Sequence, residues 1–311
     1  MKLFSGTANK PLAAEVAKLL NIQLSSAEVV RFDNSEVRVH IEENVQNETC
    51  VVIQPTANPT DTNLMELYLY CDALKRQEAK KVIAIIPYFG YARQNIQHRD
   101  GECVSSNVVI RFLEAIGFDK VYTFDLHDEG TSGVFSIPFK NLSAFSVMAQ
   151  AVKKLLNASF DRETIAIASP DQGGIERARN FGIDLFGDSN FQLTVVEKHR
   201  DQDHIHQSKA LDLYGDVKGK TVILVDDIVT SGGTLIHAAE LAKQAGATSV
   251  IAAIVHHDFS ITAPQKIINS QIETFVTSNS ILLAENQGFE KLKEVSLAPV
   301  IAEELKHFLK S

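Results

Sequence analysis

The sequence predicts an α/β fold of two similar doubly wound domains with mainly parallel sheets. Short apolar runs rich in β-branched residues alternate with amphipathic stretches at helical spacing, which is typical of parallel sheets with helices on both faces. A length of 311 residues with 45% hydrophobic content favours two cores over one. One series of runs ends and the next begins near residues 142–144, with no Gly/Ser linker between them. We therefore expect two closely packed domains, over residues 1–143 and 144–297.

Seven segments have the length and composition of buried strands. They cover residues 50–54, 82–86, 121–124, 165–168, 193–196, 222–225 and 250–255. Helical periodicity marks most of the stretches between them, at residues 64–79, 108–116, 145–156 and 235–245. Both halves carry a strand that ends in a charged or glycine-bearing loop, which hints at an internal duplication.

The charge balance argues against one broad class of function. With 39 acidic and 30 basic residues, the net charge is −9, so no basic surface is expected to bind nucleic acid by neutralising its phosphates. No apolar run approaches 18 residues, and none follows the first lysine, which predicts a cytoplasmic protein without a membrane partner. Cys50, Cys71 and Cys103 lack metal-ligand spacing and are expected to be packing residues in a reducing compartment.

Residues 222–234 have the composition of a sugar-phosphate site. The apolar residues 222–225 predict a strand and residues 235–245 a helix, so the loop between them lies at the carboxyl end of a strand, where open α/β sheets bind ligands. Its small residues let backbone N–H groups converge on a phosphate. Asp226 and Asp227 would repel phosphate and suit sugar hydroxyls or a hydrated metal ion. An ordinary strand-to-helix turn is the alternative reading.

A second loop of this kind follows the strand expected at residues 165–168. Adjacent glycines again expose backbone donors, and Asp171 adds a carboxylate. Two such loops in one domain are harder to explain as plain helix-initiating turns. In contrast, residues 215–221 only superficially resemble a Walker A loop. Three residues separate their glycines where four are required, and the segment precedes a strand.

The residues 197–200 open a polar stretch that continues to Ala210. Long polar loops within compact domains are usually lids or disordered segments. A lid bearing Lys198 and Arg200 would bring two cations to a triphosphate on closure and exclude water. Without further information, a solvated charged loop is the alternative. His204 and His206 alternate on this stretch, and we expect no transition-metal site there.

Six ordered segments together resemble the ribose-phosphate pyrophosphokinase family, the synthetases of 5-phosphoribosyl 1-pyrophosphate (PRPP). These are residues 32–36, 63–76, 86–94, 125–127, 169–174 and 215–234. Residues 226–234, Asp-Asp-Ile-Val-Thr-Ser-Gly-Gly-Thr, are similar to the ribose-phosphate loop of the phosphoribosyltransferase-like fold. The resemblance covers almost the whole chain. It implies two phosphoribosyltransferase-like domains, with a last helix in residues 298–311 that packs on the amino-terminal half.

The resemblance also implies the roles of individual residues. The catalytic cations would be Lys198 and Arg200. ATP would be bound by Phe32, Asn34, Glu36, Arg93, Gln94, Arg99 and His127. Ribose 5-phosphate would be bound by Asp171, Asp226, Asp227, Thr230, Ser231, Gly232, Gly233 and Thr234. The pyrophosphate loop would comprise Gln172, Gly173 and Gly174, and Mg²⁺ would be contacted by His127 and Asp171.

The implied activity is transfer of the β,γ-diphosphoryl group of Mg·ATP to ribose 5-phosphate, giving PRPP and AMP. In this family the Phe32 segment reaches the site from a neighbouring subunit, which predicts a homo-oligomer. Two alternatives are open. A phosphoribosyltransferase would share the ribose-phosphate loop but consume PRPP, with no need of an adenine site. A catalytically silent, synthetase-associated regulatory protein would keep the fold without the activity.

Several positions depart from the most familiar branch of the family. Ser136 and Lys140 stand where that branch has acidic residues, which removes a metal role from them. Thr230 replaces a third acid of the loop, Asn95 replaces an Asp, and Gly101 replaces an arginine of a phosphate and ADP regulatory site. These departures predict activity without added inorganic phosphate and weak inhibition by ADP.

Overall fold

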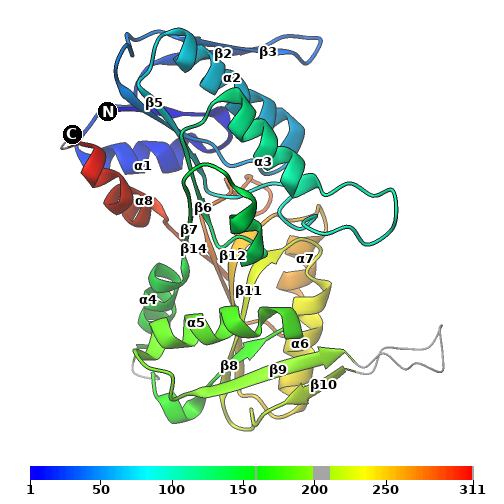
Figure 1. Cartoon of the computed structure of the whole chain (residues 1–311). Helices are drawn as coiled ribbons and strands as arrows, with labels where there is room; N and C mark the ends of the chain where they lie inside the picture. The colour runs from blue at the N-terminus through cyan, green and yellow to red at the C-terminus, as the bar shows by residue number, and fades with distance from the viewer. Residues whose placement is uncertain (158–159, 199–210, 310–311) are drawn as a thin grey trace. The chain divides into compact units, whose positions relative to one another are not determined.

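The computed structural model describes residues 1–157, 160–198 and 211–309 (Figure 1). The chain divides into two compact units. Unit 1 comprises Met1–Ser143, Ser280–Leu282 and Ser296–Ser311, and unit 2 comprises Ala144–Asn279 and Leu283–Val295. In the described part of the chain, no helix is both long enough and apolar enough to cross a bilayer.

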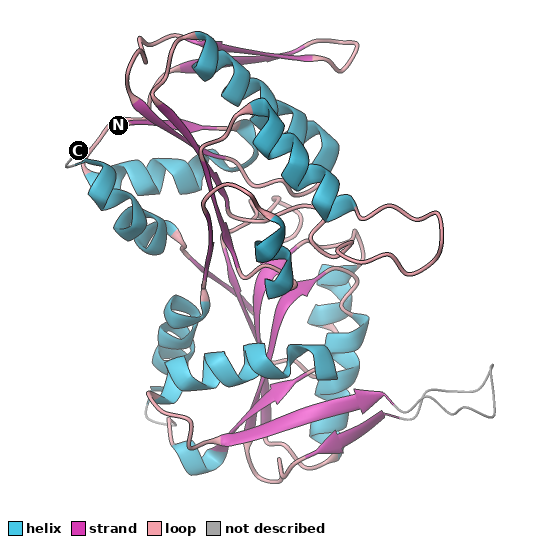
Figure 2. Cartoon of the chain, viewed as in Figure 1, coloured by secondary structure: helices cyan, strands magenta, loops and turns pink. Residues whose placement is uncertain are grey.

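Unit 1 contains a five-stranded parallel sheet with the order β1-β4-β5-β6-β7. Figure 2 shows the strands of the chain in magenta and the helices in cyan. Its strands are β1 (Lys2–Ser5), β4 (Thr49–Ile53), β5 (Lys81–Ile86), β6 (Lys120–Phe124) and β7 (Phe139–Leu142). Its helices are α1 (Lys10–Leu20), α2 (Thr60–Arg76), α3 (Ser105–Ile116) and α8 (Ala298–Leu305). An antiparallel hairpin of β2 (Ala27–Arg31) and β3 (Val37–Ile41) packs on α2.

The helices of unit 1 cover both faces of its sheet. Apolar residues of α2 and α3 form one core with β4 and β5, and Leu67, Cys71 and Leu74 of α2 lie on one helical face within it. Helices α1 and α8 pack side by side on the other face (Figure 1). The α8 segment is held by polar contacts too, since Ser296 Oγ donates to Glu15 Oε2 at 2.6 Å.

Unit 2 contains a seven-stranded sheet with the order β10-β9-β8-β11-β12-β13-β14, parallel except for the β9–β10 pair. Its strands are β8 (Ile165–Ser169), β9 (Gln192–Lys198), β10 (Leu211–Tyr214), β11 (Thr221–Val229), β12 (Ser249–His257), β13 (Thr274–Ser278) and β14 (Leu292–Val295). Its helices are α4 (Phe145–Leu156), α5 (Ile175–Phe186), α6 (Gly233–Gln244) and α7 (Ala263–Ile268).

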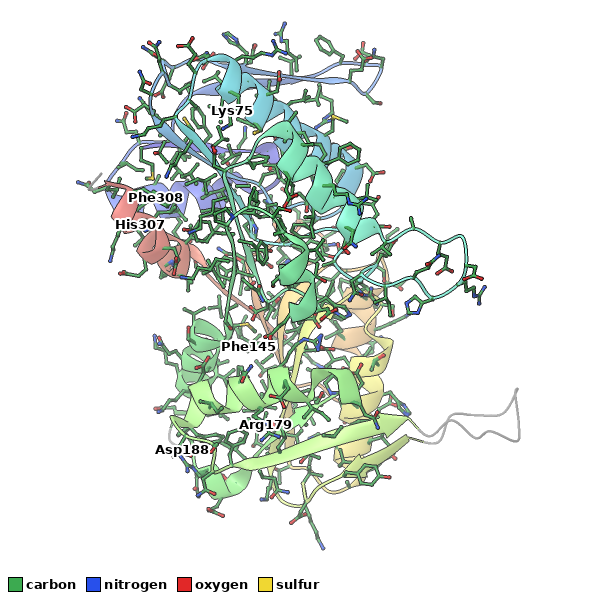
Figure 3. All side chains as sticks on the ribbon, in the orientation of Figure 1. Lys75, Phe145, Arg179, Asp188, His307 and Phe308 are labelled. Carbon is green, nitrogen blue, oxygen red and sulfur yellow. The ribbon has the colours of Figure 1, made fainter. Side chains whose placement is uncertain are left out.

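Helices also cover both faces of this second sheet. Helices α6 and α7 share a core with alternate residues of β8, β11 and β12. On the other face α4 packs against α5, where the ring centroids of Phe145 and Phe181 lie 6.0 Å apart in an edge-to-face arrangement. Phe145, at the start of α4, is labelled in Figure 3. Strands β11 and β12 are therefore covered by helices on both faces, which explains their continuous apolar runs.

The two units repeat one topology. In each, a strand, a helix, a hairpin, a strand, a helix, a strand, a helix and two strands follow in chain order. The spatial order β1-β4-β5-β6-β7 corresponds to β8-β11-β12-β13-β14. The predicted fold class of two similar, mainly parallel α/β domains is confirmed.

Two expectations need correction. Asp226 and Asp227 were expected in a loop, yet they belong to β11, whose pairing with β12 continues to Val229. This end of the strand alternates between half-buried and buried residues, so it lacks the apolar run that marks the rest. Cys50 and Cys71 are buried as expected, but Cys103 is exposed and is not a packing residue.

Candidate active site

The carboxyl ends of β8 and β11 bring two of the predicted loops together in unit 2. These strands are parallel neighbours, so the segments that follow them emerge at the same edge of the sheet. After β8, Asp171 Oδ1 accepts a hydrogen bond from Gly174 N at 3.0 Å and shapes the tight turn of residues 172–174. A Cβ on Gly174 would lie 2.6 Å from Ser169 Oγ and 3.7 Å from Asp226 Oδ1. A side chain at this position would displace Ser169 Oγ, so glycine suits the point where this turn meets the acidic end of β11.

Arg177 of α5 joins the two loops, and no sequence motif marks it as a site residue. Its Nη1 donates to the Gly173 carbonyl oxygen at 3.1 Å and lies 3.7 Å from Asp226 Oδ1. Its Nη2 lies 3.2 Å from Asp227 Oδ1. Side chains near the start of a helix lean toward its amino terminus, which directs Arg177 back to the glycine turn. The adjacent carboxylates of Asp226 and Asp227 need a nearby cation, and this need was the only feature of the sequence that pointed to an arginine in the site.

The acidic pair is only partly balanced by Arg177. The side chain of Asp227 is 3% exposed and that of Asp226 is 19% exposed. Burial raises the pKa of Asp226 well above its usual range, and the charges of Asp227 and Asp171 raise it further, against the opposing effect of Arg177. A ligand that brings hydroxyl donors or a cation to this edge would stabilise the ionised carboxylates.

The turn after β11 is short and ends in a helix. Thr230, Ser231 and Gly232 separate β11 from α6, so Gly233 and Thr234 form the first turn of that helix. Gly232 has a φ of +77°, a conformation that favours glycine. The unpaired N–H groups at the start of a 12-residue helix and its dipole suit an anion, as expected for the 5-phosphate.

In unit 1 the predicted adenine segment forms the turn of the β2–β3 hairpin. Phe32 is 45% exposed, with the Arg38 guanidinium 5.9 Å from the centre of its ring. Phe32 N donates to Glu36 O at 2.9 Å, and Asn34 Oδ1 accepts from Glu36 N at 3.2 Å. Phe32 therefore has a ring surface available for stacking, whereas the Asn34 carbonyl shapes the turn.

The other predicted ATP residues of unit 1 follow β5 and β6. Gln94 Oε1 accepts from Ser105 Oγ at 2.7 Å and so ties its loop to the start of α3. The next residue, Asn95, donates to the carboxylate of Asp128, which adjoins half-buried His127. This contact brings the Arg93-Gln94 segment and the His127 segment together. Arg93 and Arg99 are both exposed.

Of the two predicted catalytic residues, Lys198 belongs to the described part of the chain. Lys198 is the last residue of β9 and pairs with Leu211 of β10. Arg200 lies outside the described residues, as do His204 and His206. The structure therefore gives the backbone position of Lys198 at the end of β9.

Comparison with known proteins identifies the family. Residues 1–117 match the N-terminal domain of ribose phosphate pyrophosphokinase, and residues 139–289 match the phosphoribosyl transferase domain. The chain is 38% identical over 304 residues to the ribose-phosphate pyrophosphokinase of Clostridium perfringens. The aligned region covers 97% of this chain and 92% of that protein. The chain belongs to the ribose-phosphate pyrophosphokinase family. This confirms the predicted family and enzyme class.

Two further relatives support the assignment to the ribose-phosphate pyrophosphokinase family. The ribose-phosphate pyrophosphokinase of Wolinella succinogenes is 40% identical over 302 residues, covering 97% of this chain and 94% of that protein. The crystal structure of phosphoribosylpyrophosphate synthetase from Mycobacterium smegmatis superposes with a TM-score of 0.91 at 31% identity, covering 99% of this chain and 98% of that one. The similarity therefore spans both units.

The side chains of this family member suit a metal ion that keeps most of its water. Among the described residues, no three or more His, Cys, Asp or Glu side chains gather into a metal-binding group. Mg²⁺ is commonly held by one or two carboxylates together with water and substrate phosphates. Asp171 and the acidic end of β11 offer carboxylates of this kind, so the residues present fit Mg²⁺.

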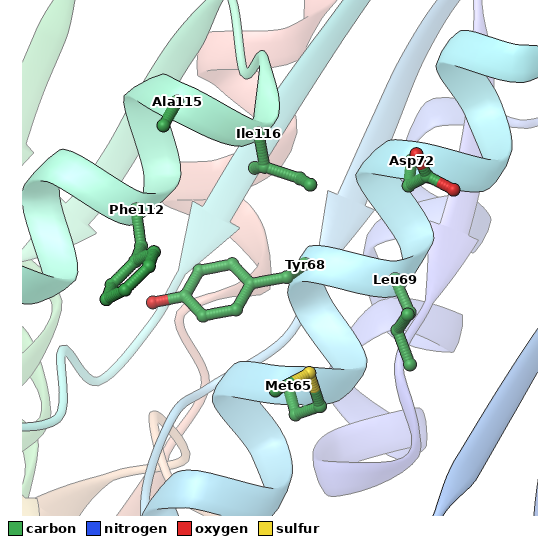
Figure 4. A pocket seen from close by; sticks show the side chains of 7 residues that line it. All are labelled: Met65, Tyr68, Leu69, Asp72, Phe112, Ala115 and Ile116. Atoms are coloured by element: carbon green, nitrogen blue, oxygen red, sulfur yellow. The ribbon is translucent and has the colours of Figure 1, made fainter.

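An apolar cavity of about 350 Å³ between α2 and α3 is a different kind of feature (Figure 4). Its lining comprises Met65, Tyr68, Leu69, Asp72, Phe112, Ala115 and Ile116. With no basic side chain and one carboxylate, this lining does not suit the phosphate groups of the family's substrates.

A buried histidine next to the ribose-phosphate turn predicts a loss of stability in acid. His257 ends β12 opposite Val229 and is 1% exposed, with Nδ1 3.2 Å from Thr277 Oγ1. Burial, assisted by His256, lowers its pKa to about 4. In the unfolded chain the pKa of this histidine is near its ordinary value of 6.5, so the unfolded state takes up a proton at a higher pH than the folded state does. The contribution of neutral His257 to the free energy of unfolding is therefore complete above pH 6.5 and is lost as the pH falls toward 4.

We expect His257→Asn, which cannot take up the proton, to remove about 1 kcal/mol of the fall in unfolding free energy between pH 7 and pH 5.5. Urea unfolding at the two pH values measures this difference. His237→Gln, at an exposed position of α6, serves as the control and should keep the wild-type dependence. Equal pH dependence in wild type and His257→Asn would contradict the prediction.

Proposed function

We propose that this chain transfers the β,γ-diphosphoryl group of Mg·ATP to the C1 hydroxyl of ribose 5-phosphate, giving PRPP and AMP. The observation that carries the proposal is the meeting of two backbone-lined turns at the acidic end of β11, in a chain similar over 97% of its length to ribose-phosphate pyrophosphokinases. The turns suit phosphate groups, and the carboxylates between them suit sugar hydroxyls.

Ribose 5-phosphate is held by unit 2 in this proposal. Its 5-phosphate accepts hydrogen bonds from the backbone of residues 230–234 at the start of α6. Asp226 and Asp227 accept from the ribose hydroxyls, and Asp171 helps to hold the ribose. The turn of Gln172, Gly173 and Gly174 provides N–H donors for the transferred pyrophosphate.

ATP is held mainly by residues of unit 1. Phe32 stacks on adenine, with Asn34 and Glu36 in the same turn. Arg93 and Arg99 bind the phosphates through bidentate hydrogen bonds from their planar guanidinium groups. Gln94 and His127 complete the nucleotide contacts. Asp171 and His127 would help to hold Mg²⁺ together with ATP, and the ion would supply neutralisation of the phosphate charge.

The reaction is a direct displacement at phosphorus. The C1 hydroxyl oxygen forms a bond to the β-phosphorus and releases its proton to water. The bond from that phosphorus to the oxygen bridging the α- and β-phosphates breaks, and AMP leaves with the electron pair. Lys198 and Arg200 stabilise the charge that shifts between the α- and β-phosphates. Positioning and charge neutralisation supply the catalysis, so no covalent enzyme intermediate is needed.

We further propose a cytoplasmic homo-oligomer that binds neither nucleic acid nor membranes. A hairpin turn with an exposed aromatic ring supports the oligomer, because such a turn can serve a neighbouring subunit's nucleotide site. Sedimentation or light scattering of the purified protein tests this part, and a monomer under assay conditions would contradict it.

The activity is tested by two parallel incubations of the purified chain. The first contains ribose 5-phosphate, ATP and Mg²⁺, and should yield AMP and PRPP. The second contains PRPP with a purine or pyrimidine base, and should yield no nucleotide. Nucleotide in the second and no AMP in the first would identify a phosphoribosyltransferase. No product in either would support the catalytically silent regulatory protein.

We expect full activity without added inorganic phosphate and weak inhibition by ADP. Gly101 stands where the familiar branch of the family has an arginine for these regulators, and its φ of +88° disfavours any other side chain. Initial rates in a phosphate-free buffer, with and without added phosphate or ADP, measure both effects. An absolute requirement for phosphate would contradict this expectation.

A further inference from the structure

The repeated topology shows where unit 1 carries counterparts of the two phosphate-binding turns. Strand β1 corresponds to β8, and each is followed by a 3-10 turn and a helix: residues Thr7–Asn9 and α1 in unit 1, residues Gln172–Gly174 and α5 in unit 2. Strand β4 corresponds to β11. The counterparts of the pyrophosphate and ribose-phosphate turns are therefore the segments that follow β1 and β4.

In unit 1 this place is filled by a side chain of the protein itself. Glu66 of α2 is 0% exposed. Its Oε1 accepts from Thr7 N at 2.6 Å and from Gln54 Nε2 at 3.3 Å, and its Oε2 accepts from Thr7 Oγ1 at 2.6 Å. A carboxylate thus takes hydrogen bonds from the first residues after both strands, as an anion would.

The segments around Glu66 leave no room for an external ligand. Gln54 Oε1 accepts from Ala8 N at 3.1 Å, so the two segments are bonded to each other. A Cβ at Gly6 would lie only 2.1 Å from Gln54 Oε1. Glu66 therefore fills the anion position of unit 1.

The third residue that contacts the Glu66 carboxylate comes from the hairpin. Arg31 Nη2 lies 3.4 Å from Glu66 Oε2, and Arg31 is the last residue of β2, directly before Phe32. The Arg31 side chain, 40% exposed, also lines a cavity of about 490 Å³ with Glu36 and Asp61. One ion pair thus connects the filled anion position to the turn that carries Phe32, Asn34 and Glu36.

We propose that Glu66 is a positioning residue for nucleotide binding: it occupies the place in unit 1 that corresponds to the phosphate-binding edge of unit 2 and, through Arg31, holds the Phe32 turn in the orientation that adenine requires. The proposal rests on the proposed function, in which that turn recognises ATP. Glu66 touches no substrate, so its effect reaches the reaction only through the hairpin.

Glu66→Gln isolates this effect. The glutamine oxygen can still accept from Thr7 N and Gln54, and its amide can donate to Thr7 Oγ1, so the packing and three hydrogen bonds persist. Only the charge opposite Arg31 is lost, and the amide N–H groups then face the guanidinium. We expect the KM for ATP to rise about tenfold, the loss typical of one charge-assisted hydrogen bond, with kcat and the KM for ribose 5-phosphate within about twofold of wild type.

Three comparisons make the test specific. Arg31→Met should raise the KM for ATP to a similar extent, and the double variant should show no further increase, because both changes break one contact. Asp72→Asn, which breaks the exposed Asp72–Arg76 pair of the helix that carries Glu66, should leave both KM values unchanged. Hydrogen exchange at residues 32–36 should be faster in Glu66→Gln than in Asp72→Asn.

Two results would overturn the proposal. One is unchanged exchange at residues 32–36 in Glu66→Gln, which is measured without any activity. The other is an equal rise in both KM values, which would indicate general structural damage. Failure of the wild-type protein to form AMP would count against the proposed function instead, and the exchange measurement would still decide whether Glu66 holds the hairpin.

Discussion

Replacing Lys198 with alanine is expected to lower kcat by a factor of about 10²–10³ while leaving the fold and the binding of ATP largely intact. In the proposed reaction its ammonium group stabilises charge that develops between the α- and β-phosphates. An interaction made only in the transition state changes kcat rather than KM. Lys198 is also the last residue of β9, so its backbone pairing with Leu211 survives the substitution.

Steady-state AMP formation at varied ATP measures this effect, and the thermal midpoint reports the fold. Lys220→Ala is a matched control, because it removes a lysine of unit 2 that bonds Gln192 Oε1 at 3.0 Å near the other end of β9. We expect that control to keep kcat within about twofold of wild type. Near-normal turnover of Lys198→Ala would exclude a transition-state role for this residue.

Replacing Arg177 with methionine is expected to destabilise the protein by about 3 kcal/mol and to raise the KM for ribose 5-phosphate. The substitution leaves Asp227, whose side chain is 3% exposed, and its neighbour Asp226 without their cation, and it removes the hydrogen bond to Gly173. Loss of the guanidinium also raises the pKa of Asp226 further, because its charge opposes the effect of burial.

The same helix offers a control for Arg177. Arg179 is 46% exposed and pairs with Glu176 at 3.5 Å, so Arg179→Met should cost less than about 0.5 kcal/mol. The loss of stability in Arg177→Lys should be intermediate between those of Arg177→Met and Arg179→Met, because an ammonium group keeps the charge but lacks the planar array of donors of a guanidinium. Chemical denaturation and ribose 5-phosphate titrations measure both quantities. Equal stability of Arg177→Met and Arg179→Met would show that Arg177 does not join the two loops.

The central strands were predictable because parallel strands covered on both faces have continuous apolar sequences. Strands β5, β11 and β12 all contain such runs. The hairpin of β2 and β3 was missed. Its residues are exposed or half-buried except Ile41, and the alternation of Val37, Val39 and Ile41 was its only short-range signal. The edge strand β14 has four residues and no apolar run.

The two turns of the site were predictable from local composition, because small residues after a buried strand are a local feature. Their connection was not. Arg177 meets Asp227 at a separation of 50 residues, and Glu66 meets Thr7 at a separation of 59. Such pairs arise from the order of strands in the sheet, which the sequence pattern alone does not specify. The resemblance to a family supplied residue types, whereas the structure supplied their partners.

Phosphorus NMR of the reaction mixture tests the central proposal, diphosphoryl transfer, most directly. With ribose 5-phosphate, ATP and Mg²⁺, we expect equal amounts of AMP and of a ribose 5-phosphate bearing a pyrophosphate on C1, with no signal from ADP. Formation of ADP together with a ribose bisphosphate would show transfer of a single phosphoryl group and contradict diphosphoryl transfer.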